Sequence, residues 1–162
     1  MKTLFVLRHA KSSWENADLS DFERPLNKRG LEAAPLMGKV IKENRFQPEI
    51  ILSSPARRAK QTAEIIKEKA EINTEIKFEE RIYEASPARL LEVVSEQSNN
   101  IERLMIVGHN PGLEGLVRLL TGQIEPMPTA ALAVIDLQIT KWSEISSSNG
   151  TLRTLIRPKE IA

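Results

Sequence analysis

Residues 3–14 read TLFVLRHAKSSW, and within this stretch an apolar, β-favouring run ends abruptly in cationic and hydroxyl groups. The segment Thr3–Leu7 is short and almost wholly apolar, which is typical of a buried strand. Arg8 and His9 follow it at once. In open α/β sheets, ligands bind beyond the carboxyl ends of the strands, so polar residues at this place are candidates for a functional site.

Segments typical of strands and of helices alternate along the rest of the chain, with no internal repeat and no long low-complexity linker. Further strands are predicted at residues 48–54, 76–78, 103–108, 131–139 and 151–156. Helices are predicted at residues 28–44, with Asn27 as the N-cap, and at 55–70, 87–97 and 111–120. Pro35 predicts either a later start of the first helix or a kink in it.

Alternating strands and helices with short connections indicate a three-layer α/β/α sandwich with a mostly parallel central sheet. The last two strands are expected as antiparallel additions at an edge, because a turn-rich SSSNG stretch separates them. At 162 residues, the chain is expected to form a single domain over residues 1–162.

The composition is that of a globular protein, with 41% hydrophobic residues, 28% charged residues and a net charge of +1. This near-neutral balance argues against a nucleic-acid partner. The chain has no cysteine, which excludes disulfides, thiolate metal sites and cysteine nucleophiles. No signal peptide and no membrane-spanning run is recognisable, so we expect a cytoplasmic protein without a membrane partner. Nothing indicates the oligomeric state.

Three of the predicted strands end in polar clusters, and both histidines of the chain lie in them. The first cluster is Arg8-His9, the second is SSPARR at residues 53–58, and the third is GHNP at residues 108–111. Because parallel strands end at the same edge of a sheet, we expect the three clusters to converge. Each feature alone also fits an ordinary structural role, such as a loop histidine or a solvated Arg-Arg pair.

Two of these clusters have the pattern of a helix start. Ser54 and Asn110 each precede a proline, as an N-cap residue precedes the first helical residue. The exposed backbone N–H groups of a helix N-terminus carry partial positive charge that suits a phosphate. Together with Arg8 and either Arg57 or Arg58, they predict a pocket for a dianionic phosphoryl group, since guanidinium groups bind two oxygens at once.

A histidine in such a pocket suggests phosphoryl transfer. A neutral imidazole can attack phosphorus in line and carry the phosphoryl group as an N-linked intermediate. Fixed positive groups can stabilise the phosphoryl oxygens without a metal ion. The chain has no acidic metal-binding cluster near the strand ends, so we expect neither a metal nor another cofactor.

The stretches LRHAKSSW (7–14), SSPARRAKQTA (53–63) and VGHNPG (107–112) resemble the motifs of the histidine phosphatase superfamily, also called phosphoglycerate-mutase-like. RHAKSSW, ERPLNKRG (23–30) and GHNPG are most similar to its SixA-type phosphohistidine phosphatase branch. The resemblance covers residues 1 to about 139. It implies a phosphoglycerate-mutase-like fold and a phosphatase that works through a phosphohistidine intermediate.

The resemblance also implies roles for single residues. His9 matches the nucleophile, and Arg8 matches the phosphate-binding arginine before it. Arg58 rather than Arg57 fits the family's Arg-Ala-x-x-Thr pattern. His109 matches the second histidine, which is expected to hydrogen-bond the phosphoryl oxygens and stabilise the transition state.

Two departures from the family pattern raise questions. Mutase-like members have an asparagine where this chain has Glu15, so we expect Glu15 to point away from the pocket or Asn16 to replace that asparagine. Mutases also use a carboxylic acid to protonate the leaving oxygen. Glu80 and Glu84 lie in the corresponding region, but outside any clear motif, and we expect them to be solvated charges.

A weak or missing general acid is consistent with phosphohistidine as the substrate. An alkoxide leaving group has a conjugate acid with a pKa close to that of water, about 15.7, whereas imidazole has a pKa of only about 6.5. The preferred hypothesis is therefore a phosphatase of phosphohistidine in a protein. A phosphatase of small phosphate esters on the same pocket and a non-catalytic phosphate-binding module stay open as alternatives.

Four further basic residues lie near the motifs. We interpret them as solvated, the alternative being that they surround the pocket and attract an acidic partner surface. They are Lys11, Arg24, Lys28 and Arg29.

Overall fold

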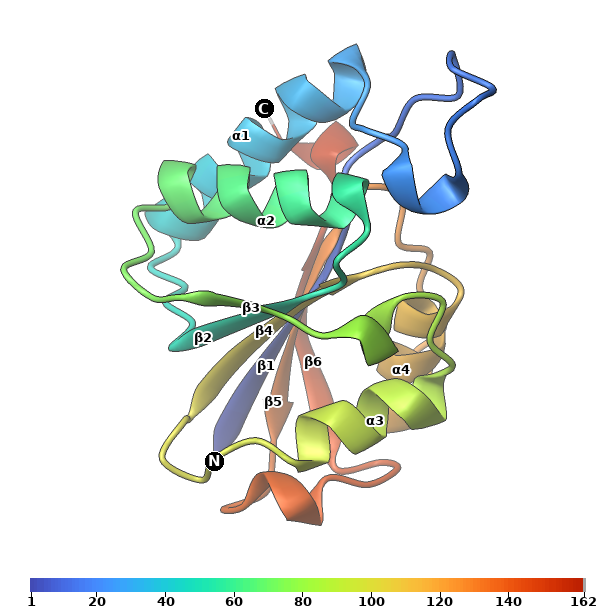
Figure 1. Cartoon of the computed structure of the whole chain (residues 1–162). Helices are drawn as coiled ribbons and strands as arrows, with labels where there is room; N and C mark the ends of the chain where they lie inside the picture. Colours follow the sequence, from blue (N-terminus) through green and yellow to red (C-terminus); the bar gives the residue numbers. More distant parts are fainter. Residues whose placement is uncertain (162) are drawn as a thin grey trace.

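The computed structural model describes residues 1–161, which form one six-stranded sheet covered by helices on both faces (Figure 1). The strands are β1 (Lys2–Arg8), β2 (Ile50–Ser53), β3 (Ile76–Phe78), β4 (Arg103–Gly108), β5 (Leu132–Leu137) and β6 (Gly150–Ile156). The helices are α1 (Lys28–Glu43), α2 (Arg57–Lys69), α3 (Pro87–Ser95) and α4 (Gly112–Thr121). No helix within residues 1–161 is long and apolar enough to cross a membrane.

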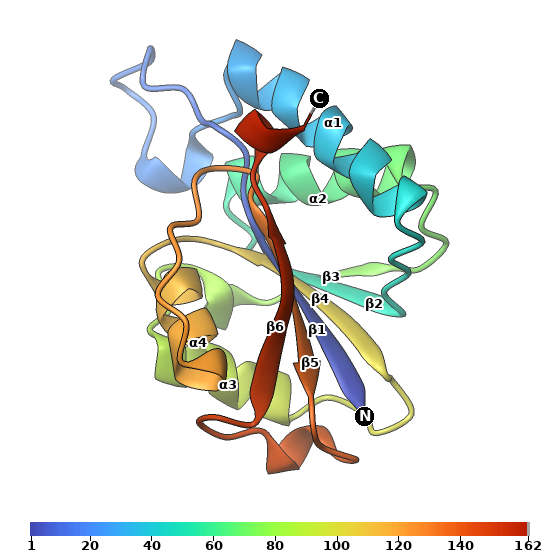
Figure 2. The same cartoon turned by 180° about the vertical axis from the view of Figure 1, so that it is seen from behind.

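The sheet has the strand order β3-β2-β4-β1-β5-β6. The first four of these strands pair in parallel, whereas β5 pairs antiparallel with β1, and β6 pairs antiparallel with β5. Figure 2 shows β6 crossing in front of the other strands when the molecule is seen from behind. The prediction of a mostly parallel sheet with a final antiparallel pair is confirmed.

Strand β1 contributes to the hydrophobic cores on both faces of the sheet. Leu4 and Val6 pack into the core beneath α3 and α4. Phe5 and Leu7 pack into the core beneath α1 and α2. Because successive strand residues point to opposite faces, a strand between two helical layers must be apolar at every position. The continuous apolar run that opens the chain has this cause, and the three-layer sandwich is confirmed.

The predicted helix starts differ from the structure in two places. Helix α2 begins at Arg57 rather than at residue 55, because the Ser54 hydroxyl accepts the N–H of Ala56 at 3.2 Å and closes a turn before the helix. Helix α4 begins at Gly112 rather than at residue 111. Asn110 nevertheless acts at its first turn, since its side-chain oxygen accepts the N–H of Glu114 at 3.2 Å.

Helix α1 does not start near Pro35, so the first of the two alternatives that Pro35 suggested is wrong. It begins at Lys28, where the side chain of Asn27 accepts the N–H of Gly30 at 2.9 Å, and it continues through Pro35. A proline removes only one intrahelical donor. The carbonyl that loses this partner belongs to Leu31, on the exposed side of the helix.

The N-terminus of α1 packs against the segment that follows His9. The N–H of Asn27 donates to the Lys11 carbonyl at 3.0 Å. A Cβ atom on Gly30 would lie 2.2 Å from the same carbonyl oxygen. Only glycine permits this approach, because the atom it would meet is backbone. The contact therefore fixes the first residues beyond β1.

We predict that Gly30→Ala lowers the free energy of unfolding by about 1–3 kcal/mol, because α1 and the Lys11 backbone must move apart. Urea denaturation monitored by circular dichroism measures the change. Glu32→Ala, at an exposed position of the same helix, is the matched control and should change the stability by less than about 0.5 kcal/mol. Equal stability of the two variants would contradict the packing argument.

Candidate active site

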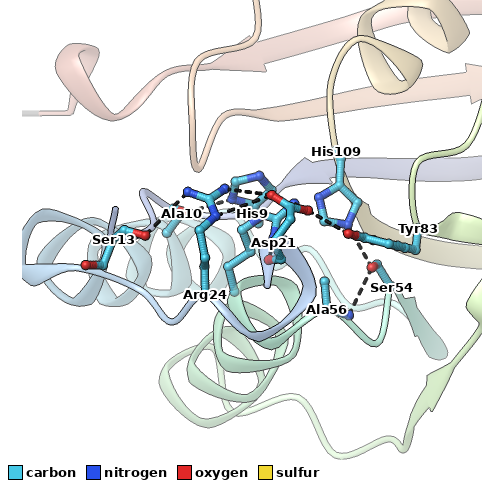
Figure 3. A network of polar contacts seen from close by, with 10 residues as sticks. His9, Ala10, Ser13, Asp21, Arg24, Ser54, Ala56, Tyr83 and His109 are labelled. Atoms are coloured by element: carbon cyan, nitrogen blue, oxygen red, sulfur yellow. Dashed lines mark hydrogen bonds and ion pairs between the residues drawn. The ribbon is translucent and has the colours of Figure 1, made fainter. Parts of the chain in front are cut away.

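Strands β1, β2 and β4 end side by side, and the polar clusters at their ends meet there. Arg8 lies opposite Gly108 in the parallel pairing of β1 with β4, and the N–H of His9 donates to the Gly108 carbonyl at 3.0 Å. The N–H of Ser54 donates to the carbonyl of Val107 at 2.9 Å. As a result, the ring centroids of His9 and His109 are 5.0 Å apart. Figure 3 shows the two side chains next to each other.

A cavity of about 550 Å³ lies at this edge of the sheet. All four predicted site residues line this cavity. They are Arg8, His9, Arg58 and His109. Arg57, one position before Arg58, is exposed and lies outside the lining. The resemblance therefore selected the arginine that faces the cavity, where the spacing of the residues left both open.

His9 is held in one tautomer by its own backbone. Its Nδ1 lies 2.7 Å from the carbonyl oxygen of Ala10. A carbonyl oxygen only accepts hydrogen bonds, so Nδ1 carries the hydrogen and Nε2 carries the lone pair. The neutral ring can therefore act as a nucleophile through Nε2, because the hydrogen bond to Ala10 involves only Nδ1.

The surroundings keep His9 neutral. Burial, together with the nearby charges of Arg58 and Arg8, lowers the pKa of His9 to about 4, against the opposing effect of the Ala10 hydrogen bond. An ordinary histidine has a pKa of about 6.5 and is partly protonated near neutral pH. His9 instead keeps its lone pair throughout that range, without a base to deprotonate it.

His109 contacts Ser54 and is also neutral. Its Nε2 lies 2.7 Å from the Ser54 hydroxyl oxygen, which itself accepts the N–H of Ala56. We assign the hydroxyl hydrogen to the bond with Nε2, which leaves the ring hydrogen of His109 on Nδ1. Burial first, and then the charges of His9 and Arg58, lower the pKa of His109 to about 3. The ring is therefore a neutral hydrogen-bond donor.

Three buried side-chain nitrogens in residues 1–161 have no hydrogen-bond partner, and all three belong to predicted site residues. They are Nε of Arg8, Nε of Arg58 and Nδ1 of His109. An unpaired buried donor costs free energy, typically about 1–3 kcal/mol, so native structures contain few of them. All three residues line one cavity, and two arginines with a neutral imidazole in one cavity fit a bound oxyanion such as a phosphoryl group, which offers several acceptor oxygens. Over the same range, no three His, Asp or Glu side chains are grouped in a way that would hold a metal ion.

Asp21, which the sequence analysis did not single out, also lines the cavity. Its backbone carbonyl accepts from Nη1 of Arg58 at 2.7 Å, and its Oδ2 accepts from Nη2 of Arg58 at 3.0 Å and from the Tyr83 hydroxyl at 2.6 Å (Figure 3). Burial raises the pKa of Asp21, but the hydrogen bonds from Tyr83 and Arg58 outweigh it and lower the pKa overall. The carboxylate therefore stays ionised and holds Arg58 in place.

The expectation that Arg24 is solvated is wrong. Only 7% of its surface is exposed, and it lines the cavity. Its Nη2 lies 3.2 Å from Oδ1 of Asp21, and its guanidinium carbon lies 3.4 Å from the ring centre of Trp14. The burial has a physical reason, because these two contacts satisfy both the charge and the flat faces of the guanidinium.

The other basic residues behave as exposed side chains. Lys28 and Arg29 are exposed and lie outside the cavity lining, in agreement with the solvated interpretation. Lys11 is exposed but does border the cavity, which agrees with the alternative that it surrounds the pocket.

The acidic candidates lie outside this cavity. Glu15 is exposed and away from the lining, as expected. Asn16 does not replace the family asparagine, because its side chain accepts the N–H of Asp18 at 3.0 Å in a local turn. Glu80 and Glu84 border a separate cavity beside Tyr83. Glu84 also borders one that includes His109.

Comparison with known proteins places the chain in a family. The residue pattern of the histidine phosphatase superfamily (branch 1) matches residues 4–97. The chain belongs to this superfamily. It is 30% identical to an uncharacterized protein of Mycobacterium tuberculosis over 150 residues, covering 86% of this chain and 91% of the relative.

Two SixA proteins are also similar. The phosphohistidine phosphatase SixA of Escherichia coli is 26% identical over 159 residues, covering 96% of this chain and 93% of that protein. A crystal structure of a SixA protein from Agrobacterium tumefaciens superposes with a TM-score of 0.84 at 27% identity, covering 97% of this chain and 98% of that one. The phosphoglycerate-mutase-like fold is therefore confirmed, and the superfamily supports phosphatase activity.

We predict that the imidazole resonances of His9 and His109 titrate with midpoints near pH 4 and pH 3 in the folded protein. Proton NMR can follow both, since the chain has only two histidines. In urea, both should titrate near pH 6.5. The unfolded chain then binds more protons than the folded one below about pH 6.5, so stability should fall as the pH drops from there toward 4. A folded-state midpoint above pH 6 would contradict the burial argument.

We predict that Asp21→Asn strengthens inhibition by inorganic phosphate roughly threefold to tenfold, because it removes a negative charge from the cavity while keeping an acceptor for Arg58. Competitive inhibition constants provide the measurement. Asp18→Asn, on an exposed position of the same loop, controls for the change in net charge. Weaker phosphate binding by the Asp21 variant would show that its carboxylate assists the anion rather than competes with it.

Proposed function

We propose that this protein removes the phosphoryl group from phosphohistidine in a protein, without a metal ion, through a covalent intermediate on Nε2 of His9. One observation carries the proposal. A neutral histidine whose Nδ1 hydrogen is already bound lines the same cavity as Arg8, Arg58 and His109, each of which has a buried side-chain nitrogen without a hydrogen-bond partner. A nucleophile and an oxyanion site thus share one space.

In the first step, the lone pair on Nε2 of His9 attacks phosphorus in line, and the P–N bond to the substrate breaks. The bonding electron pair returns to the substrate ring nitrogen. If the far nitrogen of that ring is already protonated, the ring leaves as neutral imidazole. Arg8, Arg58 and Nδ1 of His109 donate to the phosphoryl oxygens and stabilise the charge that shifts among them.

In the second step, water attacks the phosphorus of phospho-His9. The P–Nε2 bond breaks, its electron pair returns to Nε2, and one water proton passes to a phosphate oxygen. Inorganic phosphate leaves, and His9 regains its neutral form. The Ala10 carbonyl keeps the same nitrogen protonated throughout, so the same lone pair is available for the next turnover.

The absence of a suitable acid favours an imidazole leaving group over an alkoxide. Asp21 is the carboxyl that lines the cavity among the described residues, and its lowered pKa makes it a poor proton donor. An alkoxide needs a proton from the enzyme because its conjugate acid has a pKa near 15.7. A phosphoimidazole that is already protonated at its far nitrogen instead releases neutral imidazole, whose conjugate acid has a pKa of about 6.5. The name of the Escherichia coli relative points to the same substrate class.

We predict that His9→Ala lowers turnover of a phosphohistidine protein roughly 10³-fold or more. Rapid mixing of the wild type with ³²P-labelled substrate, followed by quenching, should trap enzyme-bound label that acid removes and alkali does not. Undiminished turnover by His9→Ala, or an acid-stable label on the enzyme, would exclude the mechanism.

We predict that Arg58→Ala lowers kcat/KM roughly 10²- to 10³-fold, because a donor to the phosphoryl oxygens is lost. Arg57→Ala, the exposed neighbour, is the matched control and should stay within about twofold of the wild type. Equal effects of the two substitutions would contradict the site.

The same assays separate the alternatives. A preference for sugar or nucleotide phosphates that is lost in Glu84→Gln would favour a phosphatase of small esters, since Glu84 shares a cavity with His109. Binding of phosphate groups without turnover by the wild type would favour a binding module.

A further inference from the structure

Trp14 is the most exposed large hydrophobic side chain in residues 1–161, with 78% of its surface accessible. It is not a stray surface residue, because it lines the cavity that also contains His9 and His109. An exposed indole at the mouth of a phosphoryl site offers a large flat apolar surface to whatever carries the phosphoryl group.

The indole is held in position by a chain of contacts. The guanidinium of Arg24 stacks on the ring at 3.4 Å from its centre. Arg24 is in turn fixed, since its Nε donates to Oδ1 of Asp21 at 3.3 Å and its Nη1 donates to the Ser13 carbonyl at 3.4 Å. One face of Trp14 is thus backed by a buried arginine, and the high exposure of the ring leaves the other face open. A ring held in this way loses little further freedom when it binds a ligand.

We propose that Trp14 is the leaving-group subsite of this cavity, where its open face stacks on the imidazole ring of phosphohistidine. The inference rests on the proposed function and deepens it, because it names the residue that selects the leaving group. The phosphoryl group lies among Arg8, Arg58 and His109, and the ring attached to it reaches outward to the indole.

The chemistry of the two rings is complementary. Planar rings pair favourably in offset-stacked or edge-to-face arrangements, and the electron-rich face of an indole attracts a cation. A phosphoimidazole protonated at its far nitrogen is both planar and cationic in the ring. The neighbouring cavity that shares His109 and Asn110 offers no Phe, Tyr or Trp to such a ring. Trp14 therefore provides the recognition that a bare phosphate pocket lacks.

The test compares two substrates that share the P–N bond, free phosphohistidine and phosphoramidate, whose leaving group is ammonia and carries no ring. Trp14→Ala should raise KM for phosphohistidine about fivefold to tenfold more than KM for phosphoramidate, with a smaller effect on kcat. Trp14→Phe, which keeps a flat ring, should recover most of the difference. Equal changes for both substrates, or no recovery by phenylalanine, would overturn the proposal.

A second measurement does not depend on turnover. The chain has two tryptophans, and Trp142 is fully buried, so ligand-dependent changes in fluorescence report on Trp14. Phosphohistidine should quench the emission of the His9→Ala variant, and this quenching should disappear in His9→Ala/Trp14→Phe, while inorganic phosphate alone should quench little. No quenching in His9→Ala would overturn the subsite.

The two proposals fail in different ways. If the wild type does not hydrolyse phosphohistidine, the proposed function is wrong. Quenching of the Trp14 fluorescence by phosphohistidine would still support the ring subsite. Conversely, a more than threefold weaker inhibition of Trp14→Ala by inorganic phosphate would show that the indole only supports Arg24, and would overturn the subsite while leaving the phosphatase mechanism intact.

Discussion

The parallel pairing of β1 with β4 is the constraint on which the site depends. It places Arg8 opposite Gly108, so the residues that follow, His9 and His109, leave the sheet at the same level with their rings 5.0 Å apart. Side chains alternate between the two faces along a strand. A shift of the register by one residue would therefore move the side chains of Arg8 and His9 to the opposite faces of the sheet. The packing of β1 opposes this shift, because Leu4 and Val6 fit the core on one face and Phe5 and Leu7, of different shape and size, fit the core on the other. The core thus determines the geometry of the polar edge.

The electrostatics of the cavity follow from crowding positive charge into a buried space. Burial is the main cause that keeps both histidines neutral, and the neighbouring guanidinium groups add to it because they disfavour a further positive charge. Asp21 offsets part of the arginine charge and at the same time orients Arg58. The same arginines therefore serve two purposes, since they attract an anion and preserve the lone pair that would attack it.

The sequence allowed the sheet and the positions of Arg8, His9 and His109 to be predicted because their signals are local, whereas Arg58 was chosen over Arg57 only through the family resemblance. A buried strand that ends in Arg-His or Gly-His can be recognised from a few neighbouring residues, and a parallel sheet brings such ends together. Asp21 and Arg24 lacked such a signal. They lie in and directly after a single 3-10 turn, Asp21–Glu23, which is too short to show a periodicity, and Asp21 acquires its role through Arg58 and Tyr83, which are distant in the sequence. The helix starts were misplaced for a related reason, since Ser54 can close a turn as readily as it can cap a helix.

The three unpaired nitrogens of Arg8, Arg58 and His109 also relate the stability of the fold to its function. Donors buried without acceptors weaken a native state, and apolar replacements of similar shape would relieve that weakness. An oxyanion that bound beside these residues would offer acceptors to such donors, so the anion would complete the interior rather than disturb it.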